Sequence, residues 1–161
     1  MILGMSLQTF TTIHVLISLV GIATGAYAML AMVARPGLPA VTATFLTTTV
    51  VTSATGYLFP AKAVLPSHIV GAISLLCLLV AIVALYARHL QGGWRPAYVV
   101  SASLALYFNV VVLVIQGFLK IDFLRALAPT QTEVPFLVTQ AAVLLVIAVL
   151  AMLALRRFRP I

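Results

Sequence analysis

The sequence predicts an all-α membrane protein, a polytopic bundle of five transmembrane helices. Hydrophobic residues make up 64% of the 161 residues and charged residues only 7%, whereas soluble domains carry about 25% charged residues. The mean hydropathy is +1.25. Pro, Gly and charged residues divide the chain into five apolar runs. Each run is about 20 residues long or longer, which is the length of a helix that crosses a bilayer.

The expected helices form one integral membrane domain, residues 1–161. Their ranges are about 8–33, 40–59, 67–87, 97–119 and 136–155. The second range is the least hydrophobic because it is rich in threonine, and we expect its hydroxyls to bond back to carbonyls of the preceding turn. The alternation of polar and apolar residues that a membrane β-barrel needs is missing, so a helical bundle is the remaining spanning structure.

Charge predicts the orientation, with the N-terminus outside and the C-terminus in the cytoplasm of a bacterial inner (plasma) membrane. One side of the five-helix arrangement holds most of the basic residues, and cytoplasmic segments are rich in Lys and Arg. The basic side holds Arg35, Arg88, Arg95, Arg156, Arg157 and Arg159, and the other side holds Lys62, Lys120, Arg125, Asp122 and Glu133. The net charge of +7 therefore indicates anionic lipids as partners, not nucleic acid.

Small and polar residues recur on single helix faces. In the first helix one stripe contains His14, Ser18, Gly21, Gly25 and Ala28. Gly21 and Gly25 are spaced so that a second helix can approach closely, and Gly71 lies on a comparable stripe of the third helix. We interpret these three glycines as helix-packing positions, which directs His14 into the bundle.

Four side chains are candidate cofactor-binding residues, because uncharged polar groups within a membrane are costly unless they are paired. They are His14, His68, Asn109 and Gln116. Counting 1.5 Å per residue places His14, His68 and Gln116 in one layer near the outer face and Asn109 near mid-membrane. The structural alternatives are interhelical hydrogen bonds for the two amides and interfacial imidazoles bonded to water or lipid phosphate.

These residues leave three classes of function open. Two imidazoles at similar depth fit a redox component that binds haem b or a quinone. A transition-metal site would combine His14 and His68 with Asp122 or Glu133. The alternative is a non-catalytic accessory or assembly subunit of a larger membrane complex, with other membrane subunits or a second copy as partner. The loop 126–136 contains Pro129 and Pro135 and is a candidate lid over the outer pocket.

The chain resembles small uncharacterised bacterial inner-membrane proteins. The resemblance is carried by TTIHVLISLVGIATG, TGYLFP, SHIVGAISL and YFNVVVLVIQGFLK followed by ALAPTQTEVPF. It implies an inner-membrane location and no particular activity. The chain is also similar to predicted haem-binding four-helix membrane proteins, whose histidines sit at helix ends. It departs from them by its fifth helix and by lacking the further histidines of two complete haem sites.

Overall fold

The computed structural model describes residues 2–34, 38–61 and 66–159. Over these ranges the chain is organised by helices. They are α1 (Leu7–Ala34), α2 (Pro39–Gly56), α3 (Pro66–Ile82), the π-helix η1 (Val83–Ala87), α4 (Trp94–Lys120), α5 (Asp122–Leu127) and α6 (Val134–Arg157). The predicted all-helical class is therefore confirmed for the part of the chain that the structure describes.

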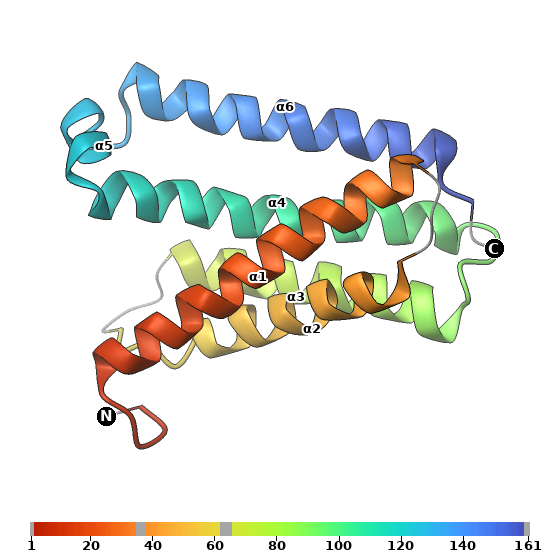
Figure 1. The fold of residues 1–161 in the computed structure, drawn as a ribbon, viewed down its shortest axis with the longest axis horizontal. Coiled ribbons are helices and arrows are strands. Elements are labelled where there is room, and N and C mark those ends of the chain that lie inside the picture. The colour runs from red at the N-terminus through yellow and green to blue at the C-terminus, as the bar shows by residue number, and fades with distance from the viewer. Residues whose placement is uncertain (1, 35–37, 62–65, 160–161) are drawn as a thin grey trace.

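The five long helices lie side by side and alternate in direction (Figure 1). As a result the start of α1 and the end of α6 lie at opposite ends of the bundle. The beginnings of α1, α3 and α6 share one end with α5 and with the final turns of α2 and α4. We call this the His14 end and the opposite one the Arg95 end.

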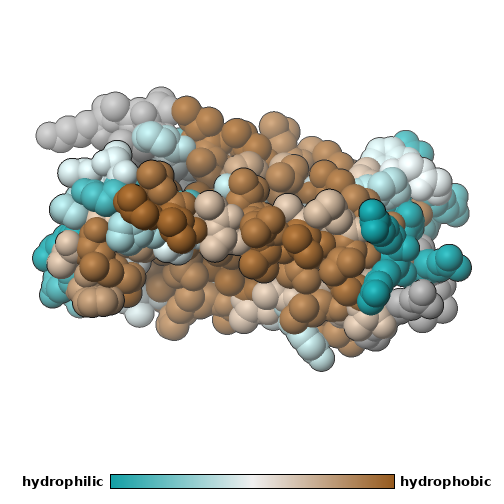
Figure 2. Space-filling view, turned by 90° about the horizontal axis from the view of Figure 1, so that it is seen from above, coloured by the Kyte–Doolittle hydropathy of each residue, from teal (hydrophilic) through white to brown (hydrophobic). Residues whose placement is uncertain are grey.

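Four of these helices are long and apolar enough to cross a membrane. They are α1, α3 continued through η1 (Pro66–Ala87), α4 and α6. The surface shown in Figure 2 is apolar over the middle of the bundle and more polar toward both ends. This arrangement is compatible with an integral membrane protein, because the wide apolar surface suits hydrocarbon and the polar ends suit headgroups.

Helix α2 is not one of the four, although the sequence predicts it as a fifth span. Its threonines lower its hydropathy, and they bond to their own helix as expected. The hydroxyls of Thr44, Thr48 and Thr55 donate to carbonyls four residues earlier at 2.9, 2.7 and 2.6 Å. The expected back-bonding is confirmed. Each of these hydroxyl hydrogens is therefore already paired with a carbonyl of α2.

Several helix boundaries differ from those expected. Helix α2 ends at Gly56 and not at residue 59, because the chain turns there with hydrogen bonds from Tyr57 N–H to Ala54 O and from Leu58 N–H to Thr55 O. The third helix changes to π geometry at Val83. Short α5 was not expected, since six residues are too few to produce a periodic pattern. Helix α4 begins at Trp94, because Pro96 in its first turn needs no amide partner.

Buried side chains pack closely where α1, α2 and α4 meet. Phe45, Met29 and Val99 are each at most 1% exposed. A Cβ atom on Gly25 would lie 2.7 Å from the Phe45 ring and 2.9 Å from Leu106. Only glycine fits at this crossing without displacing a buried side chain.

Helix α6 packs against α4 and α1, and most of its surface is exposed. At the Arg95 end its final turn is held by α4, because Arg95 Nη1 donates hydrogen bonds to Leu155 O at 3.1 Å and to Phe158 O at 2.5 Å. A cation there stabilises the carbonyls that the helix leaves unpaired at its C-terminus. These hydrogen bonds thus hold α4 and α6 together at the Arg95 end.

Candidate binding site at the His14 end

His14 is anchored to the last turn of α2. Its Nδ1 lies 2.9 Å from the Thr55 hydroxyl oxygen. The imidazole also packs edge-on against Phe59, with ring centroids 5.1 Å apart, and against Phe10 at 6.5 Å. The ring is therefore fixed by one polar and two aromatic contacts. It faces the last turn of α2.

The partners of Thr55 determine which nitrogen of His14 carries the proton. The Thr55 hydroxyl has one hydrogen. Its oxygen lies 2.6 Å from the carbonyl oxygen of Val51, which can only accept, so the hydroxyl donates its hydrogen there. The same oxygen must then accept from His14, so Nδ1 of a neutral imidazole is protonated and Nε2 keeps its lone pair. Within the described residues Nε2 has no hydrogen-bond partner and is not among the buried unpartnered atoms. It is an accessible acceptor.

A polar seam continues from His14 toward the middle of the bundle. We use this name for His14 and Ser18 of α1 together with the facing residues Thr49, Thr52 and Thr55 of α2. Ser18 Oγ lies 3.4 Å from Thr52 Oγ1. One turn deeper, a Cβ on Gly21 would lie 3.1 Å from Thr49 Oγ1. Glycine at this position brings the two backbones together around the hydroxyls.

The polar seam ends beside Asn109, and two polar atoms there lack partners. Asn109 Nδ2 would lie 3.4 Å from a Cβ on Gly21, and Thr49 is 1% exposed. Neither Thr49 Oγ1 nor Asn109 Nδ2 makes a hydrogen bond in the structure. One turn further along α1, the contact of Gly25 with Phe45 closes the seam. The seam is polar toward His14 and blocked by apolar side chains toward the Arg95 end.

His68 lies at the same end but packs on another residue. Its ring stacks on Tyr57 with centroids 5.4 Å apart and planes 16° from parallel. The Tyr57 hydroxyl donates to the His68 carbonyl at 2.6 Å. Gly71 makes room for this pair, since a Cβ there would lie 3.3 Å from the Tyr57 ring. Both histidines thus contact the segment that ends α2. His14 contacts Thr55 and Phe59, and His68 contacts Tyr57.

The remaining predicted site residues also lie at the His14 end, without joining the histidines. Gln116 is exposed. Asp122 forms an exposed ion pair with Arg125, with oxygen and nitrogen 2.7 Å apart. Glu133 accepts hydrogen bonds from the Thr130 and Thr132 amides at 3.1 and 3.0 Å. Desolvation by itself raises the pKa of Glu133, but the hydrogen bonds from Thr130 and Thr132 outweigh it and hold that pKa below its ordinary value.

The loop before α6 is attached to α4. Gln131 Nε2 donates to the carbonyl of Ile115 at 2.9 Å. The backbone of Gln131 has a φ of +60°, a value that residues other than glycine adopt only when their surroundings hold them. This loop therefore closes the α4–α6 side of the His14 end, whereas the polar seam lies between α1 and α2.

No group of three or more His, Cys, Asp or Glu side chains able to hold a metal gathers in the described ranges. The combination of His14, His68, Asp122 and Glu133 as a metal site therefore stays a prediction. Thr55, Tyr57 and Phe59 are site residues that were not predicted from the sequence. The signal available for them was the TGYLFP segment itself, in which aromatic residues follow a helix end at the depth of both histidines.

No protein-family model, curated protein sequence or solved structure matches this chain.

Proposed function

We propose that this chain is a bacterial inner-membrane protein with five spans, its N-terminus outside and its C-terminus in the cytoplasm. The alternating direction of the five long helices supports this proposal, as do the basic residues of the Arg95 end. Helix α2 has 18 residues, which extend about 27 Å at 1.5 Å per residue, close to the hydrocarbon thickness. Its back-bonded threonines can cross lipid when neighbouring helices cover them.

This topology is tested with reporter fusions at the two ends of the chain. Alkaline phosphatase is active only outside the cytoplasm, and green fluorescent protein fluoresces efficiently only inside. We expect activity from an N-terminal phosphatase fusion and fluorescence from a C-terminal fluorescent fusion. The same reporter active at both ends would contradict five spans. A reporter in the loop between α2 and α3 then determines whether α2 crosses.

We further propose that the His14 end binds a lipid-soluble redox carrier of the quinone class, in its reduced quinol form. The observation that carries this is the Nδ1–H bond from His14 to Thr55, which leaves Nε2 as an accessible acceptor. A quinol hydroxyl donates to such an acceptor. Flat aromatic side chains at Phe10 and Phe59 suit a planar ring. The surrounding bilayer supplies the solvent for the apolar tail.

A haem iron would use the same Nε2 lone pair, and His68 would be its second ligand in a bis-histidine site. The geometry favours the quinol, because His68 is stacked on Tyr57 and bis-histidine ligation needs the two rings to face each other across the iron. A visible spectrum of the detergent-purified protein separates the two ligands. If the parent protein shows a Soret band that is lost in both His14→Ala and His68→Ala, the ligand is haem and not a quinol.

The quinol proposal is tested by titrating the purified protein with a short-chain benzoquinol under anaerobic conditions. We expect His14→Phe to abolish binding, because it keeps a ring and removes the acceptor. Thr55→Val should weaken binding about tenfold, by analogy with the partners that orient metal-ligating histidines, whose loss typically costs 10–100-fold. Thr44→Val is the matched control, because Thr44 is an α2 threonine bonded to its own helix.

Equal affinity of His14→Phe and the parent chain would contradict the proposal. A colourless protein that binds no quinol and copurifies with other membrane chains would support the accessory-subunit alternative instead.

A further inference from the structure

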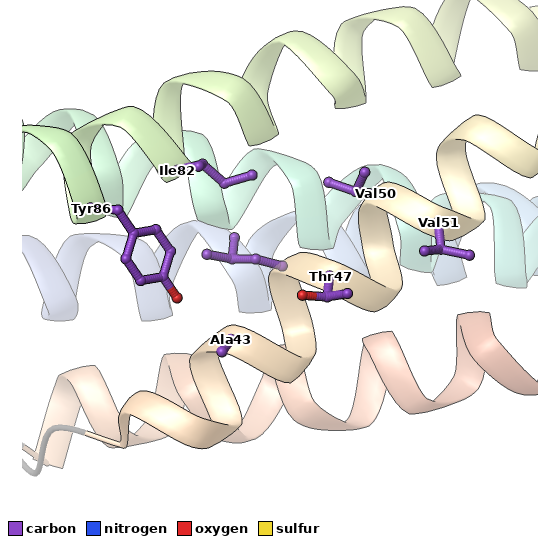
Figure 3. A pocket seen from close by; sticks show the side chains of 7 residues that line it. Ala43, Thr47, Val50, Val51, Ile82 and Tyr86 are labelled. Carbon is purple, nitrogen blue, oxygen red and sulfur yellow. The ribbon is translucent and has the colours of Figure 1, made fainter.

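An apolar groove lies between α2 and the third helix, on the face of α2 away from the polar seam. It has a volume of about 410 Å³ and is lined by Ala43, Leu46, Thr47, Val50, Val51, Ile82 and Tyr86. Figure 3 shows the α2 side chains along one wall, with Ile82 and Tyr86 projecting from the other. From Ala43 to Val51 the groove extends about 12 Å along the helix axis at 1.5 Å per residue.

The groove is bounded toward the His14 end by a helix contact. Ser53 Oγ lies 3.3 Å from Ser74 Oγ, which holds α2 and α3 together. Toward the Arg95 end the wall is formed by η1, where the chain takes π geometry from Val83 to Ala87. A π-helical turn contains an additional residue, and such turns are frequent at functional sites. Here it carries Tyr86 at the rim of the groove.

The end of η1 is held in one conformation beside this rim. Arg88 N–H donates to Val83 O at 2.9 Å and Leu90 N–H donates to Ala84 O at 2.9 Å. His89 and Leu90 have φ values of +48° and +57°. Left-handed backbone at residues other than glycine is strained and persists where the surroundings fix it. Leu90 is buried, so it anchors the turn in which Arg88 lies.

Arg88 directly follows the last residue of η1, two residues beyond Tyr86, and carries a positive charge there. Its side chain is exposed, and its guanidinium carbon lies 5.2 Å from the centroid of the Trp94 ring. Trp and Arg are both typical of the membrane interface. The other charged residues of this end within the described ranges, Arg95, Arg156, Arg157 and Arg159, are also basic, and Asp122 and Glu133 both lie at the opposite end. An anionic group is the complementary partner.

We propose that this groove binds one anionic phospholipid, with an acyl chain along α2 and the phosphate at Arg88 and the Tyr86 hydroxyl. The apolar lining selects an acyl chain, and the basic residues of the adjoining Arg95 end select an anionic headgroup. The inference rests on the proposed membrane crossing of α2, and it is independent of any ligand at His14. The proposed occupant of the groove is a lipid and not a second copy of the chain.

The test is native mass spectrometry of the delipidated, detergent-purified full chain with added phosphatidylglycerol or phosphatidylcholine. We expect one phosphatidylglycerol to bind preferentially. Arg88→Gln should weaken it about fivefold, the equivalent of roughly 1 kcal/mol per basic residue near an anionic headgroup. Arg157→Gln removes a charge from the same end, and we expect it to keep the parent affinity.

A groove-filling variant, Ala43→Phe, should abolish binding of both lipids. Tyr86→Phe keeps the groove and removes one hydrogen bond to the phosphate, so it should weaken phosphatidylglycerol binding without abolishing it. Circular dichroism checks that each variant is folded, and Tyr86→Phe tests the proposal if Ala43→Phe does not fold. Equal binding of the two lipids, or an unchanged affinity in Arg88→Gln, would overturn the proposal. A dimer lost in Ala43→Phe with no lipid bound would assign the groove to a second copy.

The failure of this proposal is distinguishable from the failure of the quinol proposal, because His14→Phe should leave phosphatidylglycerol binding unchanged. If the reporter fusions show that α2 does not cross the membrane, the acyl-chain assignment fails even if His14 binds quinol.

Discussion

The contact between α1 and α2 has two halves of opposite character. Toward the His14 end the helices meet through the polar seam, with hydrogen-bond distances of 2.9 Å at His14 and 3.4 Å at Ser18. One turn beyond Gly21 they meet through Gly25 and the Phe45 ring. The apolar half is fully packed, whereas the polar half contains unpartnered atoms. Packing thus stabilises one half, and the other half keeps polar groups at a cost in stability.

The largest expected effect comes from breaking the apolar half. Any side chain on Gly25 displaces a Phe45 ring that is 1% exposed. Overpacking of this kind costs about 1–3 kcal/mol and occasionally more. We therefore expect Gly25→Ala to lower the thermal unfolding temperature of the purified protein substantially, and Gly25→Leu to lower it further.

Gly93→Ala is the matched control for this substitution. A Cβ on Gly93 meets no atom within 4 Å, and its backbone is helical, with φ −67°. We expect no loss of stability from it. Equal loss in the Gly25 and Gly93 variants would show that the crossing at Gly25 does not limit stability.

The polar half should respond in the opposite direction. Asn109→Leu removes a buried amide nitrogen that has no partner and keeps a side chain of similar shape. Replacing an unsatisfied polar group by an apolar one is neutral or stabilising, and we expect a gain of about 1 kcal/mol. Thr49→Val should act in the same way because its hydroxyl is also unpartnered. Destabilisation by both variants, measured by thermal unfolding, would show that these groups are paired.

The smallest effect concerns the loop that precedes α6. Hydrogen bonds from Thr130 and Thr132 lower the pKa of Glu133 below its ordinary value of 4.5. The ionised carboxylate therefore stabilises the loop above about that pH, and this contribution is lost as the pH falls through the lower folded-state pKa. We expect limited proteolysis of residues 128–133 by an acid-tolerant protease to increase below pH 4.5, and Glu133→Gln to show no such transition. An identical pH profile in both chains would contradict this role.

The sequence predicted the arrangement of the helices better than the contacts of the site. Run lengths and proline positions predicted five helices of alternating direction, and a spacing of three and four residues predicted the stripe from His14 to Ala28 that faces α2. Thr55 and Phe59 as partners of His14 could not be predicted, because they depend on how α1 and α2 cross. The turn η1 was missed because a π-helical turn has the same apolar composition as the helix that it continues.

The additional residue within η1 is absorbed by one wider turn of the helix. Deleting one residue between Val83 and Tyr86 would let the helix revert to regular geometry. Because a regular turn holds one residue fewer than a π-helical turn, Tyr86 would keep nearly the same direction relative to α2. This stretch of the chain should therefore tolerate a single-codon deletion that would change the direction of the following side chains anywhere in a regular helix.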